Sequence, residues 1–120
     1  MAYIVVVDYD PTVRRLAAAL LKAAGHDVAD RESGDGLEAL LAARRPDLLL
    51  LDIQIPGRDG FTLLKAARNT QGDHPLKVIA LSAGTAPDER ERIQSAGFDG
   101  FLPKPVEVRG FAAAVKQYLP

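Results

Sequence analysis

The chain has 120 residues, enough for one domain with a single core, and its 15 basic residues nearly balance its 16 acidic ones. Bulk charge therefore gives no sign of a nucleic-acid or membrane partner, and the lack of cysteine excludes disulfides, thiolate metal sites and a thiol nucleophile. Since no apolar stretch is long enough to span a bilayer and no basic segment precedes one at the N-terminus, we expect a cytoplasmic protein.

The first part of the chain alternates between strand and helix patterns. Tyr3 to Val7 is a largely β-branched run typical of a strand, and it stops at Asp8. Asp10, directly before Pro11, suits the N-cap of a helix. The apolar stripe of this helix comprises Val13, Leu16, Ala17, Leu20, Leu21 and Ala24, and Gly25 ends it.

A short strand around residues 27–30 and a second helix follow. The pattern predicts that residues 33–36 form the entry to this helix and that Pro46 marks its exit. Its inward side carries Leu37, Leu40 and Leu41.

The centre of the chain is the segment 47–60, where four leucines run without interruption into Asp52. An unbroken apolar run fits a strand buried on both faces, as in a parallel sheet, better than a half-exposed one. A turn through Gly57 follows, and Asp59 is placed to cap a third helix. The core side of that helix carries Phe61, Leu64 and Ala67. Taken alone, Asp52 fits equally well as an acid that merely ends a strand and as a ligand-binding residue.

Two more strand–helix units complete the chain. A polar connector over residues 69–75 leads to a strand at 77–82, which ends at Ser82. Pro87 begins a helix whose apolar face is thin, with little beyond Ile93 and Ala96, and this predicts a loosely held helix. A last strand at 98–102 and a rigid turn at 103–105 precede the terminal helix. Its apolar stripe comprises Val108, Phe111, Ala112, Val115 and Leu119.

Five strand–helix units with short connectors predict a single α/β domain with a parallel sheet, right-handed crossovers and helices on both faces. Because parallel strands end at one edge, we expect Asp8, Asp52, Ser82 and Lys104 to meet there. Two carboxylates suit Mg2+, which prefers oxygen ligands, while a hydroxyl and an ammonium suit the oxygens of a phosphoryl group. Asp52 is then the natural nucleophile, because an aspartate can form an acyl phosphate.

Each strand-end residue also has a purely structural explanation. Asp8 could simply end its strand, but a second acid opposite it favours a metal site. Ser82 is followed by the small residues Ala83 and Gly84, which leave room for a ligand. Lys104 is held between two prolines, which favours a fixed functional position over a solvated one.

Four short motifs carry a family resemblance: residues 4–8 (IVVVD), 50–60 (LLDIQIPGRDG), 80–83 (ALSA) and 101–105 (FLPKP). In this order and spacing they resemble the receiver domain of two-component response regulators, over essentially all of the 120 residues. The resemblance implies one receiver domain over residues 1–120, a flavodoxin-like (βα)5 three-layer sandwich whose five-stranded parallel sheet has the order 2-1-3-4-5. It also implies a cis bond between Lys104 and Pro105.

The same resemblance implies roles for the site residues. Asp52 would accept a phosphoryl group from a histidine kinase or a histidine phosphotransfer protein, with Mg2+ required. Ser82 and Lys104 would contact the phosphoryl oxygens, Phe101 would change position on activation, and Gln54 would tune how long the phosphoryl group survives. The implied metal ligands are Asp8, Asp52 and the backbone carbonyl of Gln54.

Output would follow from a conformational change of the face formed by residues 86–119, which would bind a downstream protein. A receiver catalyses only its own phosphorylation and dephosphorylation, so we do not expect an enzyme acting on other substrates. Neither nucleic acid nor membrane is an expected partner, and weak dimerisation through the last helices is left open.

Other polar and aromatic residues allow simpler explanations. Phe101 fits the core and the switching role equally well. We expect His26 and His74 to lie on the surface and not to bind a metal. The run 88–92 is expected to be a solvated helix face with local charge pairs.

One position departs from the family pattern. Receivers usually carry two adjacent acids after the first strand, the second a direct metal ligand, whereas here the pair is Asp8 and Tyr9. A neutral phenol is a poor ligand for Mg2+, so we expect weaker metal binding than usual. Asp10 is a further candidate ligand, although its position before Pro11 favours the helix cap.

Two other functions compete with the phosphorylation switch. Tyr9 is compatible with a receiver-like interaction module that has a weakened metal site and works without phosphorylation. A small Mg2+-dependent phosphatase with an aspartyl nucleophile is disfavoured, because Gln54 occupies the place of the second acid such enzymes typically supply and fold analogy alone does not confer activity.

Overall fold

The structure is a computed structural model, and it describes residues 1–55, 59–70, 72, 75–83 and 87–120. Strands and helices alternate along the chain, as the sequence predicts. Their bounds are β1 Tyr3–Val7, α1 Pro11–Ala23, β2 Asp27–Arg31, α2 Leu37–Ala43, β3 Leu48–Asp52, α3 Gly60–Asn69, β4 Val78–Ser82, α4 Pro87–Ala96, β5 Gly100–Pro103 and α5 Phe111–Lys116.

The strands form one parallel sheet in the order β2-β1-β3-β4-β5, which confirms the predicted flavodoxin-like topology. In this register Val7 of β1 lies beside Leu51 of β3, and Asp52 lies beside Leu81 of β4. Ser82 in turn lies beside Pro103 of β5. The strands that carry candidate site residues therefore end at neighbouring positions of one edge.

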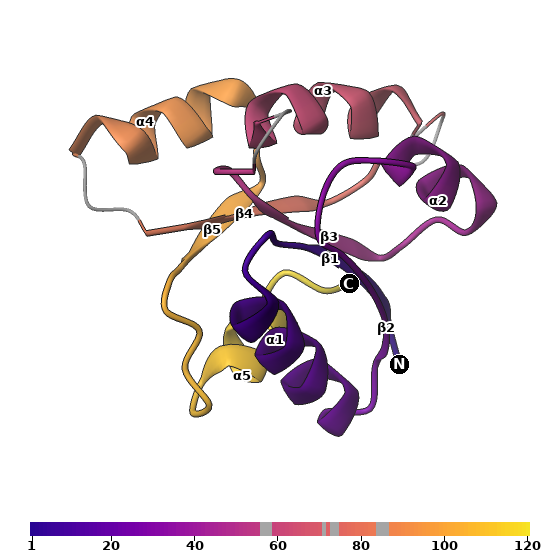
Figure 1. The fold of residues 1–120 in the computed structure, drawn as a ribbon, viewed down its shortest axis with the longest axis vertical. Helices are drawn as coiled ribbons and strands as arrows, with labels where there is room; N and C mark the ends of the chain where they lie inside the picture. The colour runs from indigo at the N-terminus through magenta and orange to yellow at the C-terminus, as the bar shows by residue number, and fades with distance from the viewer. Residues whose placement is uncertain (56–58, 71, 73–74, 84–86) are drawn as a thin grey trace.

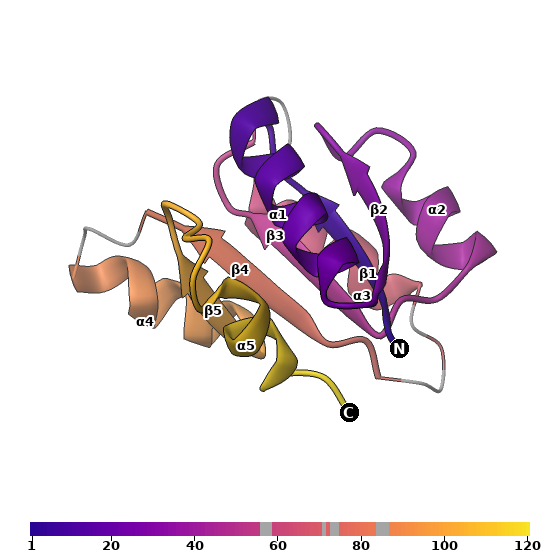
Figure 2. The ribbon, with the colours of Figure 1, turned by 90° about the horizontal axis from the view of Figure 1, so that it is seen from below.

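Helices cover both faces of the sheet (Figures 1 and 2). On one face α2, α3 and α4 pack over the sheet, and on the other α1 and α5 lie side by side. No helix in the described part of the chain has the length and apolar character needed to cross a membrane.

The leucine run of β3 supplies both halves of the core. Leu49 and Leu51 belong to the cluster under α2, α3 and α4, whereas Leu48 and Leu50 belong to the cluster under α1 and α5. Successive side chains of a strand point to opposite faces, so an unbroken apolar run is required where both faces are covered. All four leucines have an exposed fraction of 0%, and the prediction from the sequence is confirmed.

Two predicted helix caps are also confirmed. Asp10 Oδ1 accepts a hydrogen bond from the backbone N of Thr12 at 2.9 Å, and Pro11 is the first residue of α1. Asp59 Oδ1 accepts one from the backbone N of Thr62 at 2.8 Å, at the start of α3. These side chains satisfy amide groups that have no partner inside the helix.

The predicted entry to the second helix at residues 33–36 is confirmed, because α2 begins at Leu37 and its N-cap Gly36 holds a left-handed conformation at φ +73°. Other predicted bounds and core positions were wrong. Strand β5 begins at Gly100 and not at Phe98. Val108 is 68% exposed because α5 starts only at Phe111, so Val108 lies before the helix.

Two alanines assigned to apolar stripes are exposed as well. Ala24 is the C-cap of α1 and lies past its last turn, and Ala96 is the last residue of α4. Of the residues in α4, Ile93 is buried, so the apolar face is thinner than predicted. The expectations for Gly57, His74 and Gly84 fall outside the described residues.

The cap at Asp59 gives a pH-dependent prediction. The hydrogen bond from the Thr62 amide is the main reason why the pKa of Asp59 lies below its ordinary value of 3.8. A lowered pKa in the folded state means that the stabilisation is complete above pH 3.8 and is lost as pH falls through the folded pKa. We expect Asp59→Ala to lower the free energy of unfolding by about 1 kcal/mol at pH 7, and by less near pH 3.

Urea unfolding at several pH values measures this difference. Asp59→Asn is the matched control, because Asn also caps helices but does not titrate, so it should resemble the wild type at pH 7. A loss in Asp59→Ala that is the same at pH 7 and pH 3 would contradict this account.

Candidate functional site

The polar residues predicted to meet do so at the carboxyl-terminal edge of the sheet. Asp8 directly follows β1, Asp52 ends β3, Ser82 ends β4 and Lys104 directly follows β5. The exposed fractions of Asp8, Asp52 and Ser82 are 0%, 4% and 1%. Buried carboxylates need partners, because transferring an isolated charge out of water is costly.

The partner of both carboxylates is Lys104. Its Nζ lies 2.9 Å from Asp8 Oδ2 and 3.0 Å from Asp52 Oδ2. The backbone of the same residue is fixed to the neighbouring strand, because the N of Lys104 donates to the carbonyl oxygen of Ser82 at 2.8 Å. The Lys104–Pro105 bond is cis, as predicted.

Backbone amides orient the other oxygen of each carboxylate. Asp8 Oδ1 accepts from the N of Asp10 at 2.9 Å, and Asp52 Oδ1 accepts from the N of Gln54 at 3.0 Å. Asp8 Oδ2 is buried and, within the described part of the chain, receives no aligned hydrogen bond in addition to its ion pair with Lys104. This oxygen already faces one cation, the Lys104 ammonium.

The charges of the cluster do not cancel, since two carboxylates face one ammonium. Burial raises the pKa of Asp8 above its ordinary value, against the opposing effect of Lys104 and the Asp10 amide, and the charge of Asp52 adds to the rise. Burial alone would lower the pKa of Lys104, but its bonds to Asp8 and Asp52 outweigh this and raise it. A buried excess of negative charge is an environment that attracts a cation.

Two further residues position the acids, and the sequence reasoning did not single them out. A Cβ on Gly60 would lie 2.5 Å from Ile53 Cα and 2.8 Å from the carbonyl oxygen of Asp52, so only glycine lets α3 approach the end of β3 this closely. Arg14 of α1 donates to the carbonyl oxygen of Asp8 at 2.9 Å and pairs with Asp30 at 3.2 Å. Helical spacing gives no signal that would distinguish Arg14 from its exposed neighbour Arg15.

The two residues after Asp8 do not enlarge the acidic cluster. Tyr9 is 56% exposed, and Asp10 uses Oδ1 as the cap of α1. Among the described residues, no three His, Asp or Glu side chains are grouped so that they could hold a metal ion. The donor set is therefore Asp8 and Asp52, and this suits an ion that keeps several waters.

Residues of α3, of α4 and of the segment after Asp52 line a cavity of about 200 Å³. Gln54 is exposed there, two residues after Asp52. The cavity is lined by Ile53, Gln54, Asp59, Phe61, Glu89 and Arg92. Glu89 thus shares this cavity with the loop that follows Asp52.

Helix α4 contacts the two remaining candidate residues. The Ser82 hydroxyl donates to Glu89 Oε1, and the guanidinium of Arg90 lies 4.8 Å from the ring centroid of Phe101. The ring of Phe101 is partly buried against the core. The expectation of a solvated face holds for Asp88, Arg90, Glu91 and Arg92, which are exposed, but not for Glu89, which is half-buried and reaches the sheet. The periodicity of a helix does not show which charged side chain does so. His26, expected on the surface, is partly exposed, and its Nδ1 accepts a hydrogen bond from the N of Ala2 at 3.2 Å.

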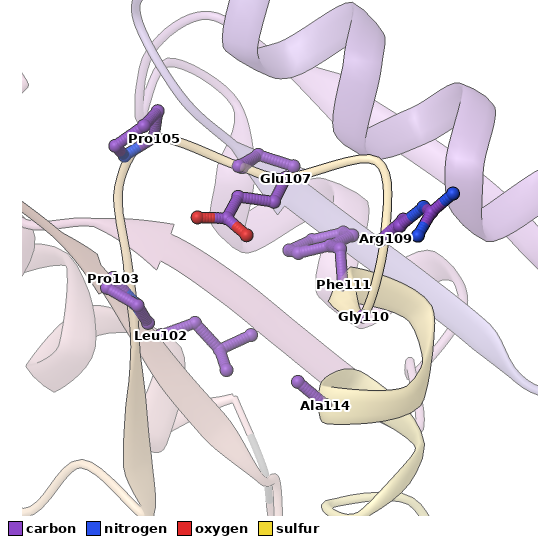
Figure 3. Close-up of a pocket in the computed structure, with 9 residues that line it drawn as sticks. Leu102, Pro103, Pro105, Glu107, Arg109, Gly110, Phe111 and Ala114 are labelled. Carbon is purple, nitrogen blue, oxygen red and sulfur yellow. The ribbon is translucent and has the colours of Figure 1, made fainter.

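A second cavity, of about 250 Å³, lies beside the loop between β5 and α5 (Figure 3). Leu102 and Ala114 face each other on its apolar side, and Arg109 points away from them. Pro103 and Pro105, which flank Lys104, also line it. None of the clustered acids lines this cavity, so it is separate from the polar site.

Sequence comparison with known proteins identifies the family to which this fold and site belong. A family profile described as "Response regulator receiver domain" matches residues 4–116. The polar-differentiation response regulator DivK of Brucella anthropi is 32% identical over 118 residues, which are 97% of this chain and 94% of DivK. The DNA-binding dual master transcriptional regulator RpaA of Synechocystis is 33% identical over 120 residues, 99% of this chain. This chain spans 49% of RpaA, and 13% of a gliding motility regulatory protein of Myxococcus xanthus that it also matches.

The fold superposes on solved structures of response regulators over nearly the whole chain. The chemotaxis response regulator CheY4 of Vibrio cholerae superposes with a TM-score of 0.87 at 25% identity, over 99% of both chains. The receiver domain of NtrX from Brucella abortus superposes with a TM-score of 0.85 at 26% identity, over 97% of both chains. The chain belongs to the response regulator receiver domain family of two-component signalling.

Proposed function

We propose that this receiver is phosphorylated on Asp52 by a histidine kinase or a histidine phosphotransfer protein. The observation that carries the proposal is the buried carboxylate of Asp52 at a strand end, with Lys104 Nζ at 3.0 Å and a second acid across the ammonium. The Gln54 amide fixes the orientation of that carboxylate. Because its orientation is already fixed, this nucleophile loses little further freedom when it reacts.

In the proposed reaction, a carboxylate oxygen of Asp52 forms a bond to phosphorus. The bond between phosphorus and the imidazole nitrogen of the donor breaks, and its electron pair stays on that nitrogen. Lys104 offsets negative charge on the phosphoryl oxygens, and the Ser82 hydroxyl can donate to one of them. The only chemistry proposed is the gain and loss of this phosphoryl group.

The donor set described above fits Mg2+. We assign the metal to Asp8, Asp52 and the backbone carbonyl of Gln54, where it would neutralise part of the charge on the phosphoryl oxygens when bound. Asp10 is committed to the cap of α1, and Tyr9 offers only a neutral phenol. Metal affinity is therefore expected to be weaker than in a site with a third carboxylate.

The proposed output is a change of the face formed by residues 86–119, which would bind a downstream protein. Phe101 is part of that face and contacts Arg90 of α4, and Ser82 is joined to the face by its bond to Glu89. A nearly complete switch requires the phosphoryl group to favour the active conformation by about 5.5 kcal/mol. A cytoplasmic location, the absence of nucleic-acid and membrane partners, and a single receiver domain over residues 1–120 stay predictions.

Phosphorylation at Asp52 is tested by intact mass after incubation with phosphoramidate and Mg2+. We expect a single phosphoryl adduct on the wild type, since this donor needs no kinase, and none on Asp52→Asn. Asp47→Asn is a control on an acid at the other end of β3, and it should still form the adduct. An adduct that survives in Asp52→Asn would contradict the assignment, as would no adduct in either the wild type or Tyr9→Asp.

The effect of Tyr9 on metal binding is a separate prediction. Tyr9→Asp adds a carboxylate next to Asp8 and should tighten Mg2+ binding on the order of tenfold, because divalent-cation affinity follows the charge of the ligands. Thermal stabilisation as a function of Mg2+ concentration measures the dissociation constant. Tyr9→Asn removes the phenol without adding charge. Equal Mg2+ affinities of Tyr9→Asn and Tyr9→Asp would contradict the explanation by ligand charge.

A further inference from the structure

Helix α4 has little apolar contact with the rest of the domain. Ile93 is its buried residue, and the sequence of this helix is dominated by charged side chains. A helix with so few apolar contacts depends on other interactions to stay in place. Two of these contacts involve residues proposed to act in the switch.

The first contact is the hydrogen bond between Ser82 and Glu89. Ser82 is 1% exposed at the end of β4, and Glu89 is half-buried in the first turn of α4. The hydroxyl donates to Oε1 of the carboxylate, which makes this a charge-assisted hydrogen bond. It joins the start of α4 directly to the phosphoryl-binding edge.

The second contact comes from the next residue. Arg90 places its guanidinium 4.8 Å from the ring centroid of Phe101, a cation–π arrangement. One turn of α4 therefore touches both the hydroxyl and the aromatic ring that are proposed to respond to phosphorylation.

We propose that Glu89 is a positioning residue: its carboxylate holds the Ser82 hydroxyl and so keeps the first turn of α4 on the site until a phosphoryl group competes for the same proton. A serine hydroxyl has one O–H to donate. When it donates to Glu89 it cannot donate to a phosphoryl oxygen on Asp52. This inference rests on the proposed phosphorylation of Asp52.

The competition has a direct consequence for α4. A phosphoryl group offers three strong acceptor oxygens and close to two negative charges, so it attracts the hydroxyl and repels the Glu89 carboxylate. Glu89 accepts the Ser82 hydroxyl at the sheet edge that Asp52 ends, so a phosphoryl group that reaches this hydroxyl also comes near the Glu89 carboxylate. Phosphorylation thus removes one of the few contacts that hold α4 and adds a force that moves its first turn outward.

A simpler explanation of Glu89 is helix stability alone. Asp88 and Glu89 are both acids in the first turn, where negative charge is favourable beside the helix N-terminus. That effect accounts for an acid but not for its bond to Ser82. Asp88 is exposed in the same turn and is therefore the matched control.

The test is hydrogen exchange of the amides of residues 91–96 in the unphosphorylated full chain. Glu89→Ala should speed exchange about tenfold, the change expected from losing one charge-assisted hydrogen bond. Ser82→Ala should give nearly the same increase, and the double variant no more than Glu89→Ala alone, because all three lack the same bond and the variants of Glu89 lose in addition only the smaller interaction with the helix N-terminus. Asp88→Ala should change exchange less than about twofold, since it removes only the interaction with the helix N-terminus.

Additive effects of Ser82→Ala and Glu89→Ala would overturn the proposal, as would equal effects of Asp88→Ala and Glu89→Ala. The comparison of Asp88→Ala with Glu89→Ala does not change Ser82, so it tests the role of Glu89 even if Ser82→Ala does not fold.

A phosphodonor arm tests the competition itself. Phosphoramidate with Mg2+ should bring wild-type exchange up to the Glu89→Ala level and leave Glu89→Ala nearly unchanged. Unchanged wild-type exchange in protein that carries the Asp52 adduct would refute the competition. If no adduct forms, the proposed function fails and the competition fails with it, while the comparison of unphosphorylated variants still decides whether Glu89 holds α4 through Ser82.

Discussion

The central interaction of the structure is one ammonium group held between two buried carboxylates. Lys104 Nζ reaches Asp8 and Asp52 at 2.9 Å and 3.0 Å, although these residues follow or end strands that are not neighbours of β5. The contact needs all strands parallel, in the observed order and register, so that the three side chains meet at one edge. It also leaves an uncompensated negative charge in a buried site, a cost to the fold that a bound cation would relieve. The site is thus supported by the fold at some expense of stability, as functional sites commonly are.

Much of this could be read from the sequence, because a few patterns have nearly unique structural solutions. The leucine run from Leu48 to Leu51 fits a strand covered on both faces, and covered parallel strands bring Asp52 to a shared edge. Asp10 before Pro11, and Asp59 before α3, are helix caps by their local chemistry alone. These features depend on periodicity or on neighbours in the chain, and such signals do not require knowledge of the tertiary structure.

Other features depend on how far side chains reach in three dimensions. Nothing in the run 88–92 distinguishes Glu89 from Asp88, yet Glu89 accepts the Ser82 hydroxyl whereas Asp88 is exposed. Arg14 holds the carbonyl of Asp8 from the next helix, and Gly60 is needed because the backbone at Asp52 and Ile53 comes too close for a Cβ. Val108 fits the spacing of an apolar stripe but lies outside α5, because helix bounds depend on local backbone conformation more than on spacing.

The central claim is that the Ser82 hydroxyl moves between Glu89 and a phosphoryl group on Asp52, with Lys104 as the fixed partner. A crystal structure of the protein with Mg2+ and beryllofluoride, a stable mimic of the phosphoryl group, tests this claim most directly. The account predicts beryllofluoride on the Asp52 carboxylate, the Ser82 hydroxyl and Lys104 Nζ within hydrogen-bond distance of its fluorines, and Glu89 released with the first turn of α4 displaced. Beryllofluoride bound at Asp52 while Ser82 still donates to Glu89, or no binding at Asp52 at all, would contradict it.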